Sequence, residues 1–158
     1  MTLTEAIARL RRACHDLSDE YTTADCLAFL NEAVQETAVL LASLRYPPLI
    51  RETILTSGDR LPDDCIAPVG IHPYRLTSGR VQLTDGRERI TLRYYSAPPR
   101  LTEDDALPYD DTICEAILLA AVIRALRQNE YDTSAEEAHL ANLRAALAAA
   151  LGAKGRRA

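Results

Sequence analysis

The most apolar stretch of the chain is Ile113–Leu126, and its hydrophobic side chains do not keep to one stripe. On a helix they divide among three faces: Ile113, Ile117 and Ala120; Leu119, Ile123 and Leu126; Leu118 and Val122. A helix that is apolar all round must be covered on nearly every side. Its uninterrupted apolar run, 116–123, is far shorter than the roughly 20 residues that a membrane span needs. The pattern therefore predicts a central helix, with the other segments as its cover.

Three further segments repeat apolar residues at the spacing of one helical stripe. They are 2–17 (Leu3, Ile7, Leu10, Cys14, Leu17), 23–44 (Leu27, Leu30, Val34, Leu41, Leu44) and 133–151 (Leu140, Leu143, Leu147, Leu151). A threonine followed three residues later by an acid, which is a typical capping pattern, precedes all four segments. These pairs are Thr2 and Glu5, Thr22 and Asp25, Thr112 and Glu115, and Thr133 and Glu136. The four pairs support a count of four helices.

The middle of the chain has a different composition. All eight prolines and four of the six glycines lie between Tyr46 and Pro108, and both residue types are disfavoured inside helices. Segment 49–56 alternates like a strand. Asp85-Gly86, between 80–84 and 87–95, predicts a hairpin turn, and on its second arm Ile90, Leu92 and Tyr94 share one face. We expect a small antiparallel sheet or a pair of hairpins, covered on one side by the helices.

These segments predict an α+β fold that is mainly helical. Two N-terminal helices (1–45) precede a strand-and-turn region (46–108), and an antiparallel helical hairpin (109–151) follows. We expect residues 1–151 to form a single domain, which suits a chain of 158 residues. Residues 152–158 are predicted to be a flexible basic tail.

Composition narrows the class of protein. The formal charge of −5 argues against a general nucleic-acid binder, which normally carries a basic excess. The N-terminus has charges throughout, unlike a secretory signal. The four cysteines contain no CxxC pair and are expected to be reduced, as in a protein made in the cytoplasm.

The sequence offers little for catalysis or cofactors. Cys14 and His15 are adjacent, so they point in different directions on a helix, and no second pair complements them as metal ligands. No nucleophile motif and no phosphate-binding glycine loop occurs. Asp110 and Asp111 are better explained by the positive end of the central helix than as part of a cation cluster with 103–105. We therefore expect no catalytic, metal or cofactor site, and a protein that is not an enzyme.

Two features suggest contacts with partners. Lys154, Arg156 and Arg157 make the C-terminal end basic, and such segments can become ordered on an acidic partner. Tyr94 and Tyr95 place one ring on each side of their strand. One ring is expected in the core and the other at a subunit interface, where tyrosine is enriched.

The order of short motifs resembles the head–tail adaptor (connector, or head-completion) proteins of tailed bacteriophages. An aromatic residue, a hydroxyl residue, an acid and a Leu-Asn-x-Ala core open the second helix at 21–33. A Leu-Pro-acid turn follows at 61–64, a strand ending in tyrosine and proline at 90–99, and a Leu-Pro entry to an alanine-rich helix pair at 107–151. The resemblance covers most of the chain, although each motif alone has low specificity. An aromatic-rich segment that relatives often carry between the turn and the Tyr-Pro strand is absent.

The resemblance implies a virion structural protein at the neck, made in the host cytoplasm. It would form a ring, commonly of twelve subunits, beneath the portal protein, and attach a downstream neck or tail protein. Genomic DNA would pass through the ring without sequence-specific binding, and no membrane would be involved. C-terminal segments of such adaptors commonly dock on the portal, which would make Lys154, Arg156 and Arg157 portal-contacting residues.

One alternative of another class stays open. The chain could be a small cytoplasmic regulatory or ligand-binding domain that uses the sheet and the acidic loop as a pocket. A large thermal shift with one small ligand would favour it, because a ligand at 100 times its Kd stabilises a protein by about 2.7 kcal/mol.

Overall fold

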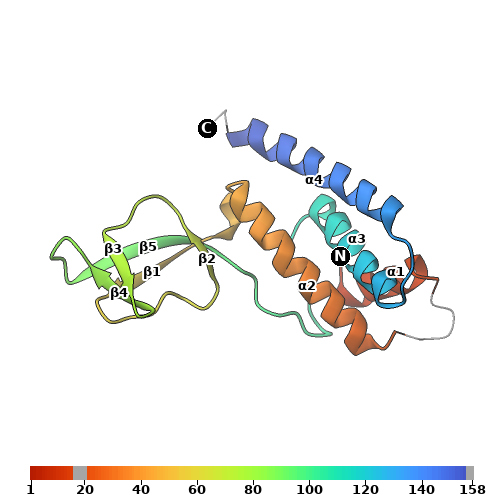
Figure 1. Cartoon of the computed structure of the whole chain (residues 1–158), viewed down its shortest axis with the longest axis horizontal. Helices are drawn as coiled ribbons and strands as arrows, with labels where there is room; N and C mark the ends of the chain where they lie inside the picture. The colour runs from red at the N-terminus through yellow and green to blue at the C-terminus, as the bar shows by residue number, and fades with distance from the viewer. Residues whose placement is uncertain (16–20, 156–158) are drawn as a thin grey trace. The chain divides into compact units, whose positions relative to one another are not determined.

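The computed structural model describes residues 1–15 and 21–155, with side chains through Gly152. Along these residues, helices come before and after the strands of two small antiparallel sheets, which confirms the mixed α+β fold (Figure 1). The elements are α1 (Leu3–Ala13), α2 (Thr23–Ser43), the 3-10 helix η1 (Pro47–Leu49), β1 (Ile50–Thr56), β2 (Cys65–Pro68), β3 (Tyr74–Thr77), β4 (Arg80–Leu83), β5 (Arg89–Ser96), α3 (Asp111–Gln128) and α4 (Ser134–Gly155).

The chain forms two compact units. The helical unit comprises Met1–Thr37 and Arg100–Ala158, and the strand-rich unit comprises Ala38–Pro99. The strand-rich unit is thus inserted into the helical one, and the boundary between them falls inside α2. The sequence predicted one domain with three consecutive regions, and it did not indicate that a single helix would serve both units.

The helical unit is built around α3, as the apolar pattern predicts. Ten side chains of this helix are buried, from all three predicted faces: Ile113, Cys114, Ala116, Ile117, Leu118, Ala120, Ala121, Val122, Ile123 and Ala125. Helix α1 packs on α3, and α4 folds back antiparallel on it (Figure 1). Two short hydrogen bonds from the Arg9 guanidinium to the Glu115 carboxylate, 2.7 and 2.8 Å, tie α1 to α3.

Two of the four predicted helix caps are confirmed. The Thr2 hydroxyl accepts a hydrogen bond from the Glu5 amide. Thr22 and Asp25 exchange hydrogen bonds in a complete capping box. The prediction for Thr112 is wrong, because α3 begins earlier and its N-cap is Asp110, whose carboxylate accepts from the Ile113 amide at 3.1 Å.

The other ends also differ from the predictions. The Thr133 hydroxyl bonds to Glu137, one residue beyond the predicted partner. Helix α1 ends at Ala13, and Leu17, predicted to continue its stripe, lies outside the described residues. Helix α4 passes through Gly152 and ends at Gly155. Gly152 has an ordinary helical conformation with open space around it, so nothing forces the helix to stop there.

The strand-rich unit contains a three-stranded sheet in the order β1-β5-β2 and a separate β3-β4 pair. The predicted hairpin at Asp85-Gly86 is wrong, because β4 pairs with β3 while β5 pairs with β1 over seven residues. The hairpin turn is Ser78-Gly79 instead, where both residues have positive φ (51° and 74°), as the tight hairpin turn requires. Asp85-Gly86 lies in a bend of the segment that connects β4 to β5.

The face predicted for the last strand is confirmed. Ile90, Leu92 and Tyr94 of β5 are buried, while alternate residues Thr91 and Arg93 are exposed. The three buried side chains join Leu55 and Val81 in a core of their own, with Leu61, Cys65, Tyr74 and Leu83 packed around it. The strand-rich unit therefore has an independent core.

Candidate interaction surfaces

The basic residues predicted to contact a portal lie at the edge of what the structure describes. Lys154 belongs to the last turn of α4, where the backbone alone is described. Arg156 and Arg157 lie outside the described residues. Their predicted role stays a prediction. What changes is the segment before them, because 152–155 continue a helix where a flexible tail was expected.

The tyrosine pair predicted at a subunit interface is buried within the chain. Tyr94 is 6% exposed and Tyr95 is 8% exposed. The Tyr94 hydroxyl donates to the Asp64 carboxylate at 3.2 Å. Burial and the neighbouring negative charge of Asp64 raise the pKa of Tyr94. Neither ring has the exposed face that the predicted subunit interface requires.

Instead, Tyr94 joins two of the short motifs to each other. Asp64 belongs to the Leu-Pro-Asp-Asp turn, and Tyr94 belongs to the strand that ends in tyrosine and proline. Both residues lie in the strand-rich unit. These motif positions therefore have a structural role in holding the turn against β5.

A second motif residue, Asn31 of α2, connects this helix to the loop at Leu101 within the helical unit. Asn31, of the Leu-Asn-x-Ala core, is 8% exposed. Its side-chain oxygen accepts from the Leu101 amide at 2.7 Å, and its side-chain nitrogen donates to the Leu101 carbonyl at 3.1 Å and to the Leu27 carbonyl at 3.1 Å. Both backbone groups of a buried loop residue are thereby satisfied. The sequence marked Asn31 as part of a motif but gave no indication of its partner.

A partly buried ion network connects α2, α3 and α4. Glu36 pairs with Arg124 of α3 and with Arg144 of α4, the latter at 2.7 Å, and Arg124 also pairs with Glu32 at 3.3 Å. Burial opposes ionisation of Glu36, but the hydrogen bonds from the two arginines outweigh it, so the pKa of Glu36 is lowered. In this network the carboxylates and the arginines pair with one another and connect α4 to α2 and α3. Its role is therefore to stabilise the helical unit rather than to bind a charged ligand.

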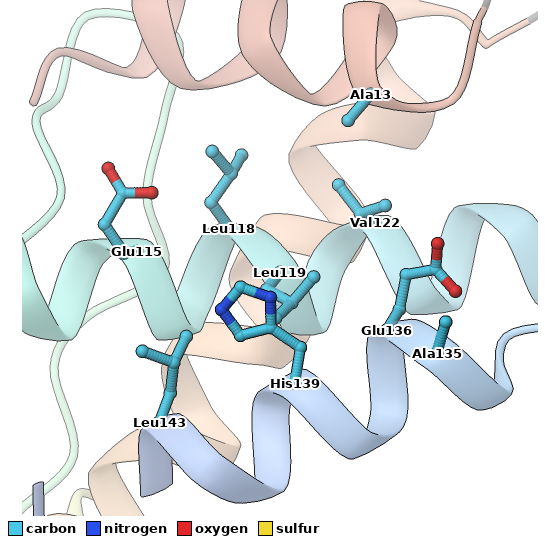
Figure 2. A pocket seen from close by; sticks show the side chains of 9 residues that line it. All are labelled: Ala13, Glu115, Leu118, Leu119, Val122, Ala135, Glu136, His139 and Leu143. Atoms are coloured by element: carbon cyan, nitrogen blue, oxygen red, sulfur yellow. The ribbon is translucent and has the colours of Figure 1, made fainter. Parts of the chain in front are cut away.

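The helical unit also has an apolar groove, which we call the α1–α3–α4 groove (Figure 2). Its volume is approximately 530 Å³. Leu118, Leu119 and Val122 of α3 form the floor, Ala13 of α1 lies on one side, and Ala135, His139 and Leu143 of α4 lie on the other. Glu115 and Glu136 stand near opposite ends of the groove (Figure 2). Sequence reasoning missed this site. Leu118 and Val122 are buried in the fold, and Leu119 is the partly exposed apolar side chain of the floor.

The strand-rich unit exposes apolar side chains of its own. Ile54 of β1 is 60% exposed, Leu76 of β3 is 52% exposed, and Ile71 in the loop before β3 is fully exposed. Single exposed apolar residues are ordinary. These three belong to different segments, and Val39 of α2, in the same unit, is also exposed (56%), so the apolar surface available to a partner is spread over the unit.

The thiols of Cys65 and Cys114 are poorly suited to nucleophilic chemistry. Burial raises the pKa of both, and the Asp64 carboxylate adds to the effect at Cys65. At neutral pH these thiols stay protonated, whereas the nucleophile is the thiolate. Among the residues described, no group of three metal-ligating side chains is present. Nor does the described part of the chain contain a helix long and apolar enough to cross a membrane.

Comparison with known proteins assigns no family to the chain. No protein-family model matches it, and no curated protein matches it. A functional assignment therefore depends on the residues and surfaces described above.

Proposed function

We propose that the chain is a virion structural protein, a head–tail adaptor that joins a bacteriophage portal to the tail and is not an enzyme. It forms a ring beneath the portal, extends the channel through which DNA passes, and presents its far side to the next neck or tail protein. The proposal places it in the neck of the virion and requires no cofactor.

The observation that carries the proposal is the order of the motifs and their place in the fold. The Asn31 motif fastens the segment that returns from the strand-rich unit, and the turn motif fastens β5 through Asp64 and Tyr94. The Leu107-Pro108 motif leads into α3, and the Leu107 amide donates to the Met1 carbonyl at 3.0 Å. The motifs that resemble the adaptor family thus stabilise the helices–strands–helices arrangement that the family suggests. The step from fold to function is an analogy.

A ring subunit needs several different surfaces, because a heterologous contact closes only by rotation and the ring must also bind partners above and below it. The two units here supply candidates of different chemistry. The helical unit has the α1–α3–α4 groove, and the strand-rich unit exposes Ile54, Ile71 and Leu76. This supports an assembly role.

Phage particles provide the test. Mass spectrometry of purified virions should detect the chain at about the copy number of the portal, and a phage lacking its gene should accumulate DNA-filled heads separate from tails. Absence from virions, together with normal tail attachment in the deletion, would refute the proposal.

The α1–α3–α4 groove also gives the ligand-binding alternative a specific site, since its volume lies within the range of small-molecule pockets. It lies among the helices, whereas we expected a pocket at the sheet and acidic loop. A thermal-shift screen against metabolites tests it. A large stabilisation by one compound, abolished by Leu119→Lys in the groove floor, would favour this alternative.

A further inference from the structure

The three-stranded sheet of the strand-rich unit has two edges of different kinds. β2 forms one edge and β1 forms the other, because β5 lies between them. β2 has four residues, ends in Pro68 and changes register between Cys65 and Ala67. A short strand with a proline and a bulge is a protected edge, which does not readily pair with another strand. β1 has seven residues without a proline and pairs with β5 in one unbroken register, so its edge lacks this protection.

The pairing of β5 determines which main-chain groups of β1 point outward. The Arg93 carbonyl of β5 accepts a hydrogen bond from the Val69 amide, which follows β2, so the main-chain groups of Arg93 point toward β2. These groups alternate in direction along an antiparallel strand. Leu92 therefore points toward β1, and its partner Thr53 points back toward β5. The alternate residues of β1 point away from the sheet, and they are Ile50, Glu52, Ile54 and Thr56.

The two outer residues of this set already use their amides. The Ile50 amide donates back into η1, and the Thr56 amide donates to the Asp59 carboxylate at 2.7 Å. Among the residues described, no hydrogen bond reaches the outward main-chain groups of Glu52 or Ile54. The middle of β1 therefore offers two amides and two carbonyls to another strand.

A second β1 in antiparallel orientation matches these groups one for one. When Thr53 lies opposite Thr53 of a second copy, Glu52 of each copy lies opposite Ile54 of the other. Opposite residues whose main-chain groups point toward each other exchange two hydrogen bonds, so the two pairs give four. A shift by two residues in either direction leaves only one complete pair, because the next pairs would need the occupied amide of Thr56 or of Ile50.

The side chains also allow this register. The two copies of Thr53 would meet in a pair without main-chain hydrogen bonds, where threonine pairs are favourable. Each Glu52 is already paired with Arg93 of its own chain at 3.1 Å, so its position beside Ile54 of the other copy adds no unpaired charge. The Ile54 side chain is 60% exposed, and the pairing would remove part of this apolar surface from water.

The edges of the resulting sheet favour a second copy over a strand of another protein. Pairing of two β1 strands gives the order β2-β5-β1-β1-β5-β2, and sheets of about six strands are common. Both outer edges are then the protected strand β2. A strand of another protein would cover β1 but would add an edge of its own.

We propose that two copies of the chain associate by antiparallel pairing of their β1 strands, centred on Thr53. Both copies contribute the same surface, so the contact closes as a dimer around a two-fold axis. This inference goes beyond the proposed function. The contacts within a ring are heterologous, and the pairing of β1 is a separate contact that requires neither a ring nor a portal.

Disulfide formation in the full chain tests the pairing and its register. Opposite residues of a pair without main-chain hydrogen bonds have Cα atoms about 4.5 Å apart, which is within the range of a disulfide. Thr53→Cys should therefore give a covalent dimer under mild oxidation, detected by non-reducing electrophoresis. The matched control is Thr91→Cys, at an exposed threonine of the central strand β5. In the paired sheet the two copies of this residue lie at least three strand spacings, or roughly 14 Å, apart.

We expect at least about fivefold more dimer from Thr53→Cys than from Thr91→Cys, because pairing raises the effective concentration of the two thiols. Thr53 is partly buried whereas Thr91 is exposed, so unspecific oxidation would favour the control. The unsubstituted protein, treated in parallel, accounts for the four native cysteines. Adding Ile54→Pro should lower the dimer to the control level, because proline removes an outward amide and leaves the hydrogen bonds between β1 and β5 in place.

Three outcomes would overturn the inference. Equal amounts of dimer from Thr53→Cys and Thr91→Cys would show that the oxidation is unspecific. Absence of dimer would leave the β1 edge to a strand of another protein. A Thr53→Cys dimer that persists with Ile54→Pro, in a protein with an unchanged circular dichroism spectrum, would show that the main chain of β1 does not make the contact. If Ile54→Pro prevents folding, the comparison of Thr53→Cys with Thr91→Cys still decides.

Discussion

Replacing Asn31 by alanine tests how the helical unit is held together. The substitution removes the partner of both backbone groups of Leu101, which is 7% exposed, and one partner of the Leu27 carbonyl. A buried backbone group left without a partner costs about 1–3 kcal/mol. The Leu27 carbonyl keeps its place in α2, so the main cost comes from Leu101. We expect a loss of about 2–3 kcal/mol in the free energy of unfolding.

Urea unfolding followed by circular dichroism at the helical band measures this loss. With an m-value of about 2 kcal/mol/M, the midpoint should fall by about 1–1.5 M with the slope unchanged. The matched control is Asn142→Ala, an exposed asparagine of α4, which should change stability by less than about 0.5 kcal/mol. A loss for Asn31→Ala as small as that of the control would refute the reasoning.

Asn31→Asp adds a test with a definite sign. Aspartate keeps an acceptor for the Leu101 amide but turns a negative oxygen toward two carbonyls, each 3.1 Å from the present nitrogen. The folded-state pKa of this carboxyl should therefore rise above its unfolded value. The penalty is fully present above the folded pKa and disappears as pH falls below the unfolded pKa of about 3.9. A pH-independent difference from the unsubstituted protein would contradict this geometry.

Three further predictions concern single contacts. Glu36→Gln should lower the free energy of unfolding by about 1 kcal/mol at neutral pH, the upper end for exposed ion pairs. Because the pKa of Glu36 is lowered in the folded state, the stabilisation is full above the unfolded pKa of about 4.3 and is lost as pH falls through the folded pKa. An equal cost of the substitution at acid pH would contradict the assignment. Gly79→Ala should destabilise the protein by about 1 kcal/mol because the φ of Gly79 is +74°. Gly152→Ala, at a helical position with open space around it, should instead stabilise it by up to about 1 kcal/mol. If thermal unfolding shows stability changes of the same sign for both substitutions, the assignment of the turn is refuted. Tyr94→Phe should cost about 1 kcal/mol by loss of the hydrogen bond to Asp64, measured by urea unfolding, and a neutral result would remove that bond from the account.

The helices were largely predictable because their signals are local. The apolar periodicity of the helices and the capping pairs at Thr2 and Thr22 depend on neighbours within a few residues. The end of α4 differs from the prediction, because the predicted helix stops at residue 151 and the observed one continues through Gly152 to Gly155. A glycine costs a helix only about 1 kcal/mol, which the alanine-rich helix tolerates.

The strand pairing was less predictable because it depends on distant residues. Asp85-Gly86 and Ser78-Gly79 are both good turn sequences, and local preference did not decide which of them joins paired strands. β5 pairs with β1 over seven residues, and β4 pairs with β3, so β4 and β5 do not form a hairpin. The burial of both Tyr94 and Tyr95 follows from tertiary packing, which alternation along one strand does not reveal.

The candidate surfaces could be only partly predicted. An apolar central helix implies a cover, but the sequence does not show that α4 covers one face incompletely and leaves the α1–α3–α4 groove open. The contacts of Asn31 with Leu101 span 70 residues of sequence. Such pairs require the fold before they can be recognised.

The measurement that tests the central claim most directly is native mass spectrometry of the chain mixed with the portal protein encoded near its gene. We predict a complex with about one copy of the chain per portal subunit, formed by the unsubstituted protein and retained by the Asn142→Ala control. A mixture in which portal and chain stay separate at micromolar concentration would contradict the adaptor role.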